Sequence, residues 1–109
     1  MRRVKITVLR KEFYPDYADA YLTDGKSVGA CPLLEVGDEF IFDGNAKMPN
    51  EFCPWASIDI YRNASSMSSG SSCKPWNNKD GQTIVCYTDG IRPVVFDVKT
   101  IGDNDDAIQ

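Results

Sequence analysis

The alternation of apolar and polar residues is clearest near the two ends of the chain. Between residues 3 and 9, an apolar side chain occupies every even-numbered position, which is the period of a half-buried β-strand. Two later runs, Thr83–Tyr87 and Val94–Ile101, are rich in β-branched and aromatic residues and predict a strand pair. Asp89-Gly90 lies between them and predicts a tight turn with positive φ angles. Pro93 cannot donate a hydrogen bond to a neighbouring strand, so a loop longer than a tight turn is the alternative.

Residues 13–22 change to a helical period. Pro15 suits a first helical turn, and Tyr14, Tyr17 and Tyr21 recur at three- and four-residue spacing. We expect these tyrosines to pack a short helix onto a sheet, because aromatic side chains carry large apolar surfaces.

The middle of the chain predicts one more strand and a second helix. Gly37-Asp38 indicates a turn before a strand at residues 39–43. Pro54 then favours a helix to about Met67, with Cys53 as its cap. The serine-rich segment 65–72 should fray this helix into a flexible loop. The expected apolar positions of the helix are Trp55, Ile58, Ile60, Tyr61 and Ala64.

The order βαβαββ predicts one α+β domain spanning residues 1–109, with a mainly antiparallel sheet of about four strands and two short helices. A small β-barrel with helical inserts is the alternative. The 42% hydrophobic and 26% charged residues are typical of a soluble globular protein.

Composition and charge indicate the cellular compartment and the classes of partner to expect. No apolar run approaches the roughly 20 residues that span a membrane, and the first residues resemble a strand more than a signal peptide. We therefore expect a cytoplasmic protein without membrane contact. The net charge of −4 argues against nucleic acid, which requires clustered basic side chains. A protein partner or a homo-oligomer remains open.

The chain contains no histidine. This excludes the commonest general base, the commonest metal ligand and any Ser-His or Cys-His nucleophile pair. Catalysis would have to use cysteine, carboxylate, lysine or tyrosine. We therefore favour a protein that is not an enzyme.

The four cysteines include no C-x-x-C pair, so their spacing lacks the signal of a zinc ribbon or a thioredoxin. Cys53 is expected at a helix N-terminus, where backbone N–H groups favour a thiolate. If Cys31 and Cys86 approach it, the three sulfurs could bind zinc or an iron–sulfur cluster, with Cys73 or Asp59 as fourth ligand. Alternatively, the cysteines pack as small apolar residues or act as reactive thiols, while disulfides are disfavoured in the cytoplasm.

An enzyme would use the Cys53 thiolate as nucleophile, Asp59 or Asp89 as acid, and Arg92 to hold an anion. Asp89 already has a sufficient role in its turn. Trp55 and Trp76 could line a pocket, although tryptophans more commonly belong to a core.

Three segments, GACPLLEVGDEFIFDG, MPNEFCPWASIDIY and CYTDGIRPVVFDVKTI, cover most of the chain and together resemble a family of short uncharacterised prokaryotic proteins. Cys31, Cys53 and Cys86 match the cysteines of that family. No established activity follows from the resemblance. The chain departs from the family before Pro75-Trp76, where the serine run and Cys73 replace a glycine- and aromatic-rich segment, so a role for Cys73 is doubtful.

Three functions compete on this basis. The first is a non-catalytic accessory or binding domain in which the three motif cysteines bind a metal or pack as thiols. The second is a thiol-dependent enzyme using Cys53, and the third is a purely structural interaction protein.

Overall fold

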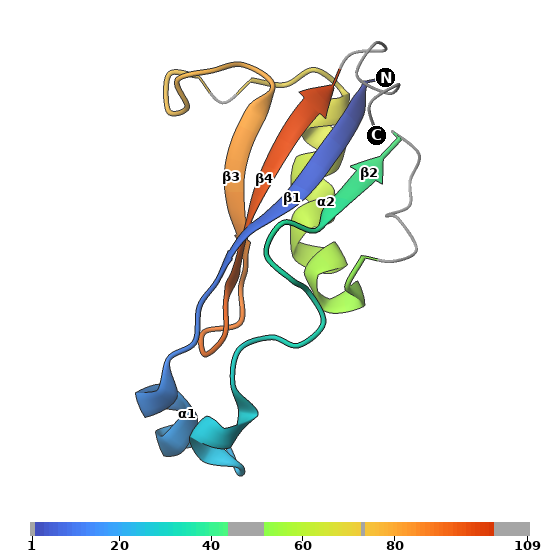
Figure 1. Cartoon of the computed structure of the whole chain (residues 1–109). Coiled ribbons are helices and arrows are strands. Elements are labelled where there is room, and N and C mark those ends of the chain that lie inside the picture. Colours follow the sequence, from blue (N-terminus) through green and yellow to red (C-terminus); the bar gives the residue numbers. More distant parts are fainter. Residues whose placement is uncertain (1, 44–51, 73, 102–109) are drawn as a thin grey trace.

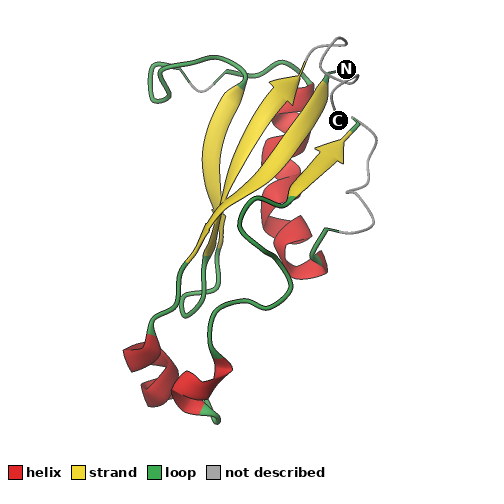
Figure 2. Cartoon of the chain, viewed as in Figure 1, coloured by secondary structure: helices red, strands yellow, loops and turns green. Residues whose placement is uncertain are grey.

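The computed structural model describes residues 2–43, 52–72 and 74–101. Within them the chain forms one antiparallel sheet in the order β2-β1-β4-β3, with α2 across one of its faces (Figures 1 and 2). The predicted α+β class is confirmed, and the barrel alternative is wrong because the sheet is open. The elements are β1 (Arg3–Lys11), α1 (Pro15–Tyr21), the 3-10 helix η1 (Gly25–Val28), β2 (Glu39–Phe42), α2 (Pro54–Ser68), β3 (Gln82–Tyr87) and β4 (Val94–Ile101).

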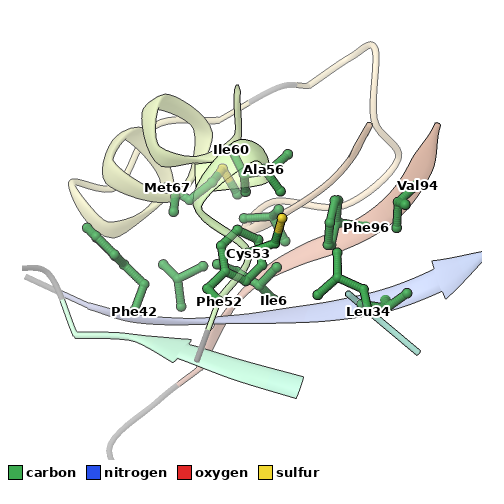
Figure 3. Packing of buried hydrophobic residues seen from close by; sticks show 14 of the residues in the cluster. Ile6, Leu34, Phe42, Phe52, Cys53, Ala56, Ile60, Met67, Val94 and Phe96 are labelled. Atoms are coloured by element: carbon green, nitrogen blue, oxygen red, sulfur yellow. The ribbon is translucent and has the colours of Figure 1, made fainter. Parts of the chain in front are cut away.

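The core lies between the sheet and α2. Alternate residues of β1 and β4 point toward the helix and are almost fully buried, as the period-two pattern predicts (Figure 3). Phe96 of β4 lies against Phe52, with ring centroids 5.5 Å apart. On the helix, Ala56, Ile60 and Ala64 recur every fourth residue and form its buried stripe.

The second helix begins at Pro54 with Cys53 as its N-cap and ends at Ser68, within one residue of the predicted end at about Met67. Ser68 is buried, and its Oγ donates a hydrogen bond to the backbone oxygen of Arg2 at 2.5 Å. The expectation that the serine run frays the helix was therefore wrong at residues 65–68, whereas residues 69–72 lie outside the helix. The burial of Met67 and the hydrogen bond from the Ser68 hydroxyl to Arg2 outweigh the weak helix propensity of serine.

The first helix does not pack on the sheet. Figure 1 shows α1 and η1 together at the end of the molecule remote from α2. The radius of gyration is 15.2 Å, whereas about 13 Å is usual for a compact domain of this length. Tyr17 and Tyr21 are 52% and 79% exposed, so the prediction that the tyrosines pack against a sheet was wrong. The chain leaves the sheet after β1, and α1 packs against η1 instead, burying only Ala18.

The connection between β3 and β4 is the longer loop that Pro93 left open, and the expected tight turn at Asp89-Gly90 is not formed. Gly90 does not adopt a positive φ angle, and residues 88–93 form an extended loop. The Asp89 Oδ1 atom accepts hydrogen bonds from the backbone N–H groups of Ile91 and Arg92, at 2.8 and 3.2 Å. Asp89 thus shapes the loop by side-chain bonding to the backbone, which is a common role of aspartate in turns.

Candidate functional site

Two of the three motif cysteines lie in the core. Cys31 is 5% exposed and Cys53 is 6% exposed, and Figure 3 shows Cys53 within the buried cluster. The Cys31 backbone oxygen accepts a hydrogen bond from Lys11 Nζ at 2.9 Å. Cys86 is exposed, and Cys73 lies outside the described residues.

The sheet separates Cys86 from Cys53. In β3, Thr83, Val85 and Tyr87 turn toward α2, so the alternating Cys86 points to the opposite face. Among residues 2–43, 52–72 and 74–101, no group of three or more histidine, cysteine or acidic side chains is close enough to hold a metal ion. The structure therefore does not bring the three cysteines together, and it leaves Cys53 packed as a small apolar residue.

Of the polar residues predicted to act with Cys53, Asp59 of α2 contacts the loop that carries Asp89 and Arg92. Asp59 Oδ2 accepts hydrogen bonds from the Thr88 backbone N–H and hydroxyl, at 3.3 and 3.0 Å. This contact ties α2 to the loop that follows β3. Asp59 and Asp89 both accept from neighbouring backbone groups, and these bonds give each carboxylate a structural role.

The hydroxyl of Tyr87 interacts electrostatically with the side chains of this region. Partial burial raises the pKa of its hydroxyl, and the negative charges of Asp89, Cys53 and Asp59 raise this pKa further. The positive charge of Arg92 acts in the opposite direction on the pKa. The phenol of Tyr87 is accordingly held in its neutral form, in which it can donate a hydrogen bond.

The two tryptophans are exposed, contrary to the expectation of core positions. Trp55 is 66% and Trp76 is 91% exposed. Trp55 lies four residues before Asp59 and therefore on the same side of α2, which is the side nearest β3. Asn77 Nδ2 donates to the Gln82 backbone oxygen at 3.1 Å, which places the loop carrying Trp76 beside the start of β3.

The strand between these tryptophans is an edge of the sheet. Among the described strands, β3 is last in the order and pairs only with β4. Its sequence, QTIVCY, contains no charged residue and no proline, and its register with β4 runs without a shift. Ile84 on this strand is 53% exposed. We call the outer edge of Gln82–Tyr87 together with Trp55 and Trp76 the β3 edge surface.

The other edge is better protected. β2 has four residues, begins with a glutamate and forms an ion pair, Lys5 Nζ to Glu39 Oε2 at 3.6 Å. Short strands and charged side chains are the usual devices that prevent an edge from pairing with another chain. β3 is longer and lacks both charge and proline, so its open backbone groups are free of those devices.

The β3 edge surface was not found by the sequence reasoning. Its signal was present in the uncharged run QTIVCY, but the run predicts a strand without indicating that the strand lies at an edge. The helical pattern predicts a core position for Trp55, but α2 contains more apolar residues than its buried stripe holds.

A scan against protein-family models found no match to this chain. Searches of curated proteins and of solved structures found no match either. In the described part of the chain, no helix is both long and apolar enough to cross a lipid bilayer.

Proposed function

We propose that this protein is a non-catalytic interaction domain that binds a protein partner by adding a β-strand to the outer edge of β3. The observation that carries the proposal is the six-residue edge strand without charge, proline or bulge. Strand addition uses backbone hydrogen bonds for affinity and alternate side chains for specificity.

Two further features of the same side support this function. Ile84 offers an exposed apolar side chain in the middle of the strand, and Trp55 and Trp76 flank the edge. Tryptophan is enriched among the residues that dominate binding energy at interfaces. The buried Cys53, by contrast, has the packing of a core residue and offers little access to a substrate.

The proposal is tested by a charge placed on the edge. Tagged wild-type chain and the variant Ile84→Lys are expressed in the source cells, and co-purifying proteins are quantified by mass spectrometry. We expect a stoichiometric partner with the wild type, either another protein or the untagged copy of this chain, and its loss with Ile84→Lys, because a lysine on an edge strand opposes pairing. Leu33→Lys is the matched control, since Leu33 is 59% exposed but lies in the loop that leads to β2.

Retention of the same partner by Ile84→Lys would contradict the assignment of the β3 edge surface as the binding site. Equal loss in both lysine variants would show a general effect of surface charge and would contradict it as well.

A further inference from the structure

Resting on the proposed function, we infer that the strand added to the β3 edge is β3 of a second copy of this chain. The two strands run antiparallel about a two-fold axis at Ile84, and the two sheets join into one continuous sheet. In such an isologous contact, each residue of the strand meets the symmetry-related part of the same strand.

The backbone bonding pattern determines which groups are available. The Thr100 backbone N–H donates to the Gly81 oxygen at 2.7 Å, so this is a hydrogen-bonded pair of the β3–β4 ladder. Bonded and non-bonded pairs alternate in antiparallel sheets. The backbone groups of residues 83, 85 and 87 therefore point to β4, while those of Gln82, Ile84 and Cys86 point outward.

This pattern selects one register. With the axis at Ile84, Gln82 of each copy lies opposite Cys86 of the other, and Ile84 lies opposite its own counterpart. All the outward-facing groups of β3 are then paired, giving up to about six hydrogen bonds. The Gln82 oxygen already accepts from Asn77, but a carbonyl has a second lone pair. Moving the axis by one residue in either direction leaves some of these groups unpaired.

The side chain on the axis is compatible with the same arrangement. A residue on a two-fold axis faces itself, so a charge there would be repelled, and Ile84 is apolar and 53% exposed. None of the residues Gln82–Tyr87 carries a charge, so no like charges meet along the two paired strands.

The exposed tryptophans are placed where this dimer would cover them. Trp76 lies beside the start of β3, and Trp55 lies on the side of α2 that contacts Thr88, just after the end of β3. Antiparallel pairing brings Trp76 of one copy toward Trp55 of the other, and symmetry repeats the contact. Covering these aromatic side chains enlarges a contact that strand pairing alone would leave small.

Sedimentation equilibrium of the purified full chain tests the dimer. We expect twice the chain mass of 12.2 kDa for the wild type and for Leu33→Lys. Ile84→Lys places two lysines against each other at the axis and should weaken association by at least about a hundredfold. Trp76→Ala, which changes a loop and not the strand, should weaken it by about tenfold or more.

A cross-link tests the register and does not depend on a destabilising variant. Gln82→Cys, in a Cys73→Ser background, places a thiol opposite the native Cys86 of the second copy. Bonded antiparallel pairs have Cα atoms about 5.5 Å apart, which is within the range of a disulfide. Mild oxidation should give a covalent dimer, whereas the control Lys99→Cys, one strand further from the edge, should not.

The sedimentation and cross-linking results can each overturn a different part of the inference. A dimer that Ile84→Lys does not weaken, or a Lys99→Cys cross-link as strong as that of Gln82→Cys, would overturn the inferred interface. A monomeric wild type at about 100 µM would overturn the second copy as occupant, since even weak specific contacts associate near that concentration. If a different protein is then lost with Ile84→Lys in the co-purification experiment, the proposed function stands and only the inference about the second copy fails.

Discussion

Ile60 and Ile58 lie two residues apart on α2, and replacing each with alanine separates burial from residue type. Ile60 is fully buried, whereas Ile58 is 78% exposed. The substitution removes three side-chain carbons, each contributing about 0.8 kcal/mol when buried. A residual cavity adds to this loss, so Ile60→Ala should lower the free energy of unfolding by about 3 kcal/mol.

Ile58→Ala removes the same atoms from a site that is mostly in water. The lost burial is about 0.5 kcal/mol, and the higher helix propensity of alanine offsets most of it. We expect a change within about 0.5 kcal/mol, as is usual for surface positions. With about 2.1 cal/mol/K of unfolding entropy per residue, the Ile60 variant should melt about 13 °C below the wild type.

Urea unfolding followed by circular dichroism measures both variants. The midpoint should fall for Ile60→Ala and stay nearly constant for Ile58→Ala, with an unchanged slope in each case. Low protein concentration keeps any self-association out of the comparison. Equal destabilisation by the two substitutions, or a larger effect at Ile58, would show that α2 packs with a different face and would refute the core described above.

The remaining predictions concern the site around Cys53. With a thiol reagent at neutral pH, Cys86 should react at least about a hundredfold faster than Cys31 and Cys53, and equal rates would show that the two core thiols are accessible. Tyr87→Phe should reduce alkaline unfolding, because a raised folded-state pKa gives stability that is present below the unfolded value near 10 and is lost above it; unchanged alkaline midpoints would contradict this. Asp59→Ala should lower the free energy of unfolding by about 1–2 kcal/mol through loss of its two hydrogen bonds to Thr88, measured by urea unfolding, and no change would show that this contact is not formed in solution.

Local periodicity predicted the strands and the second helix well because each has a buried face with a regular repeat. The alternation in residues 3–9 and the Pro54 helix start both appear in the structure at nearly the expected positions. Periodicity did not predict where α1 lies, because its tyrosine spacing is the same whether the side chains meet a sheet or water. The turn at Asp89 differed because an aspartate side chain can replace the backbone bond that a tight turn supplies.

The candidate site depended on information that spacing does not contain. Cys31, Cys53 and Cys86 come from separate segments, and whether they meet depends on strand parity. Cys86 is one residue away from Val85 and Tyr87, which face α2, so a one-residue difference decides between a shared cluster and opposite faces of the sheet. The contact between Asp59 and Thr88 in the loop after β3 likewise depends on how α2 lies on the sheet, which spacing does not contain.

The positions where sequence and structure disagree are themselves informative. Foldable sequences satisfy local and global preferences together, and exceptions concentrate where function requires them. Trp55 is an apolar residue left outside the buried stripe of its helix, and Ile84 is an apolar residue on an open edge. Both lie on the β3 side of the molecule, beside the strand without charge or proline. A solvent-exposed edge of this kind favours aggregation unless it is covered, and this is the physical reason for the proposed pairing with a partner strand.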